Sequence, residues 1–179
     1  AALDVDQVGD ALYHASGLFR DGSIQGNRGR SADNLTEVVW LPFDADLLDY
    51  MGYPAGTADD DKARRKAAMD ELAQMAQPEL DGLIAALRAD LEETFRALAI
   101  PMHRLDYTGY GLCAYVYVAP ADRHRVQDAR AAHKHLVTII NEQYGDRLVD
   151  PQCSDAGTRV TRVPGSANRK GATARRVVS

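Results

Sequence analysis

The stretch Thr36–Asp46, which reads TEVVWLPFDAD, decides how this chain is expected to fold. Its first part is rich in β-branched and aromatic residues and has the length of a buried strand. Asp44 and Asp46 follow directly, so two carboxylates are expected at the end of that strand. Residues two apart on a strand project to the same face, about 6.6 Å apart along the chain. Both carboxylates could therefore reach one pair of metal ions lying roughly 3.5–4 Å apart.

The same Asp-x-Asp spacing occurs at two other places, where we expect a different meaning. Asp4 and Asp6 lie in a polar N-terminal stretch, and Asp59 and Asp61 open a predicted helix. Acidic residues in a first helical turn are stabilised by the positive end of the helix dipole. Both pairs are therefore interpreted as helix-start acids.

A third carboxylate and a basic loop lie far downstream. Asp150 follows an apolar pair, and residues 162–170 read RVPGSANRK. Arg162, as a planar fork, and Lys170, as a point charge, are natural partners for phosphate oxygens. The Pro-Gly pair within the loop predicts a tight turn that aims these side chains inward. Three carboxylates and a basic loop are what is needed to hold divalent metals against a triphosphate, and they point to nucleotidyl transfer.

In this order, the motifs resemble the catalytic domain of the archaeo-eukaryotic primase superfamily, and most of all the primase-polymerases of phages and plasmids. The resemblance extends from about residue 36 to the C-terminus. It implies that Asp44 and Asp46 form the first motif and Asp150 the third. These three residues would be catalytic and would bind two Mg²⁺ or Mn²⁺ ions.

The second motif of the family, Ser-Gly-x-Gly-x-His before a strand that contains tyrosine, differs in one residue here. Residues 108–115 read TGYGLCAY, so Cys113 stands where the family has histidine. That histidine is thought to contact the nucleotide phosphates, and a neutral thiol is a poor substitute. The triphosphate would then be held by the basic loop and the glycine turn, or by another side chain such as His103, or the domain is impaired. The alternative for His103 is a partly buried residue at a strand start. The expected nucleotide-binding set is Gly109, Gly111, Cys113, Arg162, Asn168 and Lys170.

The remaining pattern predicts an α/β chain of the α+β kind. We expect an RRM-like split βαβ sheet with helices on one face, an N-terminal helical segment and a helical insertion. The expected elements are a helix at 5–17, the strand 36–43, helices at 59–75 and 78–98, strands at 103–107 and 111–118 joined by a turn at 108–111, a helix at 121–144 and a short strand at 147–149.

Other candidate ligands are given structural interpretations. His133 and His135 are two apart on a predicted helix and point about 200° away from each other, so they are expected on a solvated face rather than at one metal. Tyr115 and Tyr117 alternate on a strand, where core packing is favoured over base stacking.

Length and composition agree with one catalytic domain over residues 1–179, with an N-terminal segment at 1–35 and a core at 36–179. The chain is 45% hydrophobic, and its two cysteines are too few for a disulfide framework and lack Cys-x-x-Cys spacing. No apolar stretch reaches 18 residues and no signal peptide opens the chain, so a cytoplasmic protein without membrane partners is expected, in the bacterial host if phage-encoded. Because the chain starts at alanine and stops soon after a predicted strand begins, we expect a domain excised from a longer protein, followed by a helicase region.

The formal charge of −5 does not exclude DNA, because the charges are segregated. Every charged residue from 157 to 179 is basic, whereas acids concentrate between 59 and 93. Local basic clusters hold phosphates whatever the net charge, and weak, salt-sensitive binding is predicted. The expected partners are a single-stranded DNA template, a primer, and dNTPs or NTPs.

The function predicted is that of a DNA primase and DNA polymerase, which transfers a nucleoside monophosphate to a 3′-hydroxyl by a two-metal mechanism in phage or plasmid replication. Two alternatives remain open. One is a non-catalytic nucleic-acid-binding domain of a replication initiator. The other is a metal-dependent nuclease; a rolling-circle nickase would need a strand with a His-hydrophobic-His motif, which this chain lacks.

Overall fold

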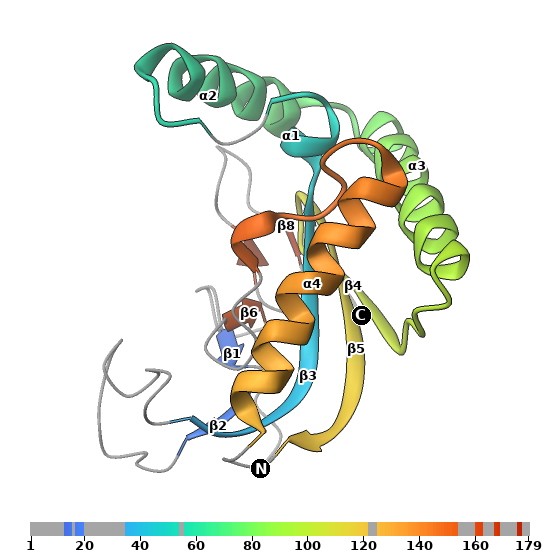
Figure 1. Ribbon diagram of the computed structural model, residues 1–179. Helices are drawn as coiled ribbons and strands as arrows, with labels where there is room; N and C mark the ends of the chain where they lie inside the picture. Colours follow the sequence, from blue (N-terminus) through green and yellow to red (C-terminus); the bar gives the residue numbers. More distant parts are fainter. Residues whose placement is uncertain are drawn as a thin grey trace, which may run out of the picture.

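The computed structural model describes residues 13–15, 17–19, 35–53, 56–121, 125–153, 160–162, 167–168 and 175–176. It is a mixed structure of the α+β class (Figure 1). The helices are α1 (Leu47–Tyr50), α2 (Asp59–Gln74), α3 (Gln77–Ala97), α4 (Val126–Tyr144) and the 3₁₀ turn η3 (Pro151–Cys153). The strands are β1 (Tyr13–Ala15), β2 (Gly17–Phe19), β3 (Leu35–Asp46), β4 (Arg104–Tyr107), β5 (Gly111–Ala121), β6 (Val160–Arg162), β7 (Ala167–Asn168) and β8 (Arg175–Arg176).

The main sheet has the strand order β2-β3-β5-β4, and each neighbouring pair is antiparallel. β5 therefore lies between the Asp-x-Asp strand β3 and the hairpin strand β4. The helices α2 and α3 connect β3 to β4, and α4 follows β5. The expected succession of strand, helices, strand, strand and helix is confirmed, and it corresponds to the first five parts of a split βαβ unit.

Helices α3 and α4 cover the same face of this sheet. Along β3, the side chains of Leu41, Phe43 and Ala45 are buried. The ring of Phe43 packs edge-on against Phe95 of α3, at 5.4 Å between centroids, and against His133 of α4, at 4.9 Å. One side chain of the sheet thus contacts both helices. Figure 1 shows α4 running along β3. The prediction of helices on one face is confirmed.

Three sequence-based expectations about secondary structure are wrong. The helix expected at 5–17 is replaced, over its described residues, by β1 and the start of β2. β1 pairs with β6 and β2 with β3, so pairing with distant segments overrides the local pattern. The helix expected from residue 121 begins at Val126, because β5 continues to Ala121. The strand expected at 147–149 does not form.

His133 is also wrongly predicted, because it is fully buried rather than solvated. The buried face of α4 carries Val126, His133, Val137 and Ile140, so the histidine belongs to the helix's apolar stripe. Its Nε2 atom lies 2.8 Å from the carbonyl oxygen of Pro42 in β3, which gives this ring nitrogen a hydrogen-bond partner. His133 therefore contributes to the core.

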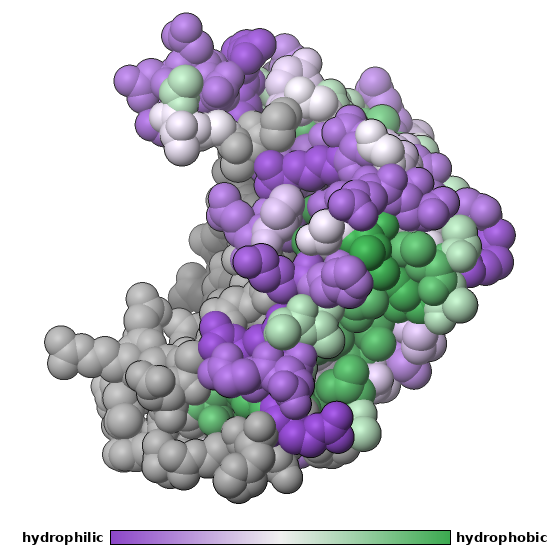
Figure 2. Space-filling view, viewed as in Figure 1, coloured by the Kyte–Doolittle hydropathy of each residue, from purple (hydrophilic) through white to green (hydrophobic). Residues whose placement is uncertain are grey.

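Helix α2 is polar over most of its surface. Its buried residues are Ala68, Leu72 and Ala73. On the face that Figure 2 shows, most of this helix is hydrophilic, and in Figure 1 it extends away from the sheet. In the described residues, no helix combines the length and apolar character needed to span a bilayer.

Candidate active site at the end of β3

The two aspartates of the first motif lie at the end of β3. They alternate with buried Ala45, so they project to the face of the sheet opposite the helices. The register of β3 and β5 pairs Asp44 with Cys113 and Asp46 with Gly111. The structure thus brings the first motif and the glycine turn together, as predicted.

Asp150 reaches the same place from the loop after α4. Its backbone N–H donates a hydrogen bond to the carbonyl oxygen of Asp44, with an N···O distance of 2.8 Å. The loop is held by Asn141 of α4, whose side-chain oxygen accepts from the amides of Leu148 and Val149 at 2.9 Å each and whose NH₂ donates to the Val149 carbonyl at 3.0 Å. These are the bonds that a neighbouring strand would otherwise supply, which explains why the third motif needs no strand at 147–149.

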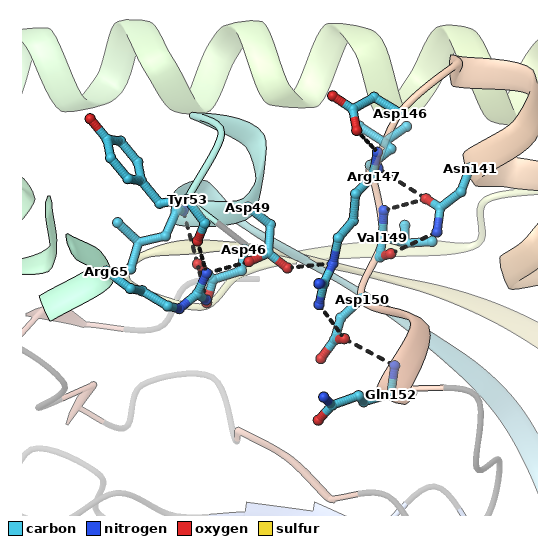
Figure 3. Close-up of polar contacts among 12 residues, drawn as sticks. Asp46, Asp49, Tyr53, Arg65, Asn141, Asp146, Arg147, Val149, Asp150 and Gln152 are labelled. Atoms are coloured by element: carbon cyan, nitrogen blue, oxygen red, sulfur yellow. Dashed lines mark hydrogen bonds and ion pairs between the residues drawn. The ribbon is translucent and has the colours of Figure 1, made fainter. Parts of the chain in front are cut away.

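Two arginines connect the carboxylates of the site through a buried aspartate. Asp49 of α1, whose side chain is 4% exposed, is ion-paired with Arg65 of α2 and with Arg147 of the loop after α4. Arg65 Nη2 also lies 3.3 Å from Asp46 Oδ1, and Arg147 Nη2 lies 2.8 Å from Asp150 Oδ1. The result is a continuous chain, Asp46–Arg65–Asp49–Arg147–Asp150, which we call the carboxylate–arginine network (Figure 3).

Sequence reasoning did not find Asp49, Arg65 or Arg147. A signal exists for two of them: Asp49 lies three residues after Asp46, and Arg147 three residues before Asp150. Arg65 gave no signal of its own, because α2 carries several exposed arginines and lysines of the same appearance.

Burial dominates the electrostatics of Asp49. Burial raises the pKa of the Asp49 carboxyl, and the opposing effects of Arg65 and Arg147 lower it by less. A carboxylate that is costly to keep charged inside the protein needs cationic partners. The two guanidiniums supply them.

The donor set agrees with the expected metals in chemistry, since carboxylate oxygens are the ligands that Mg²⁺ and Mn²⁺ prefer. Over the described residues, however, no group of three or more His, Cys, Asp or Glu side chains is arranged to hold a metal ion. Asp46 and Asp150 instead face guanidinium groups. The clustered carboxylates therefore attract cations, and in this structure arginines fill that role.

The glycine turn is shaped by close contact with β3. Gly109 has a φ of +96°, and its carbonyl accepts a hydrogen bond of 2.6 Å from the Tyr107 hydroxyl. A Cβ added to Gly111 would lie 2.3 Å from the Ala45 carbonyl oxygen. Gly111 therefore allows the backbones of β3 and β5 to approach beside Asp46.

Cys113 is buried in the row of residues that crosses three strands. Its register partners are Asp44 on β3 and Asp106 on β4. Asp106 is buried and receives two hydrogen bonds from Arg104, at 2.8 and 2.7 Å. The thiol thus occupies a packed position on the site side of the sheet.

His103 does not lie beside Cys113. It precedes the Cys113 partner Asp106 by three residues, which is about 10 Å along the strand direction. Its Nδ1 atom accepts a hydrogen bond of 3.1 Å from the Tyr117 amide, and the residue is exposed. His103 therefore does not occupy the position of the family histidine, and the alternative of a partly buried residue is wrong.

An aromatic group lies on the same face of the sheet, farther along the strands. The ring centroids of Trp40 and Tyr117 are 5.3 Å apart, those of Trp40 and Tyr115 are 6.0 Å apart, and His103 lies 5.2 Å from Tyr117. Tyr115 is buried, as predicted for core packing. Tyr117 is 42% exposed, so core packing is wrong for this residue.

The remaining predicted site residues belong to the C-terminal region. Arg162 pairs in register with Tyr13, and Asn168 with Arg175. The side chains of Arg162 and Asn168, and the whole of Lys170, lie outside what the structure describes. Their phosphate-binding roles stay predictions.

Comparisons with protein-family models, curated proteins and solved structures gave no significant match. The site is therefore interpreted from its own geometry.

Proposed function

We propose that this domain is a DNA primase-polymerase of the archaeo-eukaryotic type, which carries out template-directed nucleotidyl transfer in phage or plasmid replication. One observation carries the proposal. The hydrogen bond from the Asp150 amide to the Asp44 carbonyl joins the third carboxylate motif to the Asp-x-Asp strand across more than a hundred residues of sequence. Two carboxylate motifs that are far apart in sequence thus lie next to each other, and carboxylates from such motifs are the ligands that two-metal transfer requires.

The roles follow from position and chemistry. Asp44, Asp46 and Asp150 would hold Mg²⁺ or Mn²⁺, and the bound cations would lower the pKa of the attacking 3′-hydroxyl and offset the charge of the leaving pyrophosphate. The carboxylates project to the face of the sheet opposite α3 and α4, and a primer end and a nucleotide would approach them from that side. Arg162, Asn168, Lys170 and the Gly109–Gly111 turn would contact the nucleotide, as the family pattern implies.

The aromatic group supports binding of single-stranded nucleic acid. Trp40 and Tyr117 lie on the same face as Asp44, four residues farther along the strands, and His103 packs against Tyr117. Exposed aromatic rings on a sheet can stack with bases, at about 1–3 kcal/mol per base. A template strand that passes over these rings would reach the carboxylates.

Primer extension tests the proposal. A labelled primer on a DNA template is incubated with Mn²⁺ or Mg²⁺, and with dNTPs or NTPs in separate reactions. We expect Asp44→Asn and Asp150→Asn to reduce extension on the order of 100-fold or more, because each removes a metal ligand worth several kcal/mol. Asp59→Asn is the matched control: it alters an exposed aspartate with the same Asp-x-Asp spacing, and full activity is expected. Unchanged extension by both site variants would refute the metal-site assignment.

One alternative has an observation in its favour. Asp46 and Asp150 are already neutralised by arginines, and Cys113 replaces the expected histidine, which would suit a non-catalytic DNA-binding domain. That alternative would be supported if the protein binds the template but neither extends the primer nor binds nucleotide in a metal-dependent way. Cleavage of the template in the same assay would indicate a nuclease.

A further inference from the structure

The carboxylate–arginine network contains two guanidiniums that are held in place but remain accessible. Arg65 comes from α2 and Arg147 from the loop after α4, and the side chain of each is 23% exposed. Each spans from the buried Asp49 to one carboxylate of the presumed metal set (Figure 3). Asp49 thus holds both guanidinium groups at the edge of the site.

The hydrogen bonding of Arg147 is incomplete. Its Nε atom is buried and lies 2.9 Å from Asp49 Oδ2, but it is not aligned as a hydrogen-bond donor. Among the residues that the structure describes, this atom has an ion pair and no hydrogen bond. A buried donor without a hydrogen bond costs free energy, so Arg147 would be stabilised by turning toward a new acceptor.

Metal ions and these arginines compete for the same atoms. Arg65 pairs with Oδ1 of Asp46, and Arg147 pairs with Oδ1 of Asp150. A divalent cation bound by those oxygens would repel the adjacent guanidinium. A triphosphate entering with the metal offers new anionic oxygens, and the planar fork of arginine matches phosphate geometry.

We propose that Arg65 and Arg147 are the phosphate-binding residues that replace the missing histidine, and that they transfer from Asp46 and Asp150 to the nucleotide triphosphate when metal binds. Asp49 is the positioning residue for both. This inference rests on the proposed nucleotidyl transfer, and it names residues of the nucleotide site that the family pattern does not supply.

Two binding measurements test this exchange, and the arginine variants are expected to change the two affinities in opposite directions. The first is Mn²⁺ binding without nucleotide, followed by electron paramagnetic resonance; the second is equilibrium binding of dATP, and separately of dAMP, in the presence of Mn²⁺. We expect Arg65→Gln and Arg147→Gln to weaken dATP binding about tenfold, which is the effect of one lost charge-assisted contact, and to leave dAMP binding within about twofold. The same variants should bind Mn²⁺ about threefold more tightly, because a competing cation has been removed.

The matched control is Arg64→Gln, on the same helix as Arg65. Arg64 is exposed and pairs with Asp61, away from the network, so neither binding constant should change. Asp49→Asn should raise KM for dNTPs in primer extension and leave kcat nearly unchanged, because it disturbs the position of the arginines and not the metal ligands. Thermal melting of each variant shows whether it is folded, and Arg65→Lys and Arg147→Lys, which keep the charge, should restore part of the dATP affinity.

The outcomes separate this inference from the proposed function. Loss of both Mn²⁺ and dATP binding in a folded arginine variant would indicate a structural role and overturn the exchange. A wild-type protein that extends primers, together with arginine variants that bind dATP normally, would overturn only this inference. A wild-type protein that neither extends primers nor binds dATP would overturn both.

Discussion

Gly111 lies at a position in the site that has no room for a side chain. A Cβ there would lie 2.3 Å from the Ala45 backbone oxygen, and a backbone neighbour cannot rotate away. We expect Gly111→Ala to lower the free energy of unfolding by about 1–3 kcal/mol or more, as overpacking does. The measurement is urea denaturation.

Gly82 provides the matched control for that substitution. It lies within α3, and an added Cβ would meet nothing within 4 Å. Gly82→Ala should raise the free energy of unfolding by about 0.5–1 kcal/mol, because alanine is the better helix former. Equal effects of the two alanine substitutions would refute the proposed close approach of β3 and β5.

Some candidate site residues could be identified from the sequence, because they stand next to apolar segments. Asp44 and Asp46 follow an apolar run and lie at the end of β3, as expected; Asp150 follows an apolar pair, but that pair forms no strand. Arg65 could not be identified, because its position in the site arises from an ion pair between α2 and Asp49 of α1. Such a pairing leaves no periodic signal in the sequence.

Among the elements, the loop that carries Asp150 depends on Asn141. Asn141→Ala removes three hydrogen bonds to the backbone of Leu148 and Val149. We expect a loss of about 1–3 kcal/mol in the free energy of unfolding, since backbone groups are left unsatisfied, together with faster amide hydrogen exchange at these two residues. Asn141→Asp retains the two acceptor bonds and should lose less. Normal exchange at Leu148 and Val149 in the alanine variant would contradict this role.

Helices α1, α3 and α4 are joined by a shared carboxylate. The hydroxyls of Tyr50 and Tyr144 both donate to Asp90 Oδ2, at 2.8 and 3.0 Å. Burial, followed by these hydrogen bonds to Asp90, raises the pKa of both tyrosines above the ordinary value of 10.0. The stabilisation is therefore fully present below pH 10 and is lost as the pH rises through the raised native pKa values.

Tyr144→Phe tests this connection between the helices. We expect a loss of about 1 kcal/mol in the free energy of unfolding at pH 8, the usual value of one hydrogen bond. The difference from wild type should shrink above pH 10, because the wild-type protein then loses the contribution of this tyrosine. The readout is chemical denaturation at both pH values, and Tyr53→Phe, at an exposed tyrosine, is the control. If the difference in the free energy of unfolding between wild type and Tyr144→Phe stays constant to pH 11, the hydrogen bond to Asp90 does not join the helices as described.

The elements that the sequence predicted are those with a strong local period. Helix α3 was expected from an apolar stripe, and Leu80, Leu87, Leu91 and Phe95 are buried on it. β1 and β2 were not expected, because three-residue strands are stabilised by their partners β6 and β3. The missing strand at 147–149 was unpredictable for a related reason: a side chain, Asn141, takes the part of the neighbouring strand.

For the whole molecule, the sheet order and the placement of α3 and α4 agree with the predicted α+β arrangement. The sequence could predict this because the order of elements restricts the topologies of a small sheet. It could not predict how the carboxylates would be neutralised. That depends on Arg65 of α2, which the sequence identifies only as a helical insertion, and on Arg147 of the loop after α4.

Gathering carboxylates at one strand end should make the stability of the whole molecule depend on divalent cations. If the proposed metal site is correct, Mn²⁺ at about 100 times its dissociation constant stabilises the folded state by about 2.7 kcal/mol, which corresponds to roughly 5–10 °C in Tm. EDTA should reverse the shift. Asp150→Asn should remove most of it, and Asp59→Asn should not. An equal Tm increase in the Asp150 variant would place the cations elsewhere.

The two aspartates of the first motif differ in structural role, because one oxygen atom of Asp46 has two partners. Asp46 Oδ1 accepts a hydrogen bond of 2.9 Å from the Leu48 amide, which caps α1, and it also faces Arg65. Asp44 lies inside β3 and caps no helix. In a library of variants selected only for folding, position 46 should therefore keep capping residues such as Asp, Asn, Ser and Thr. Position 44 should accept a wider set, so the two halves of one motif would diverge at different rates once selection for activity is relaxed.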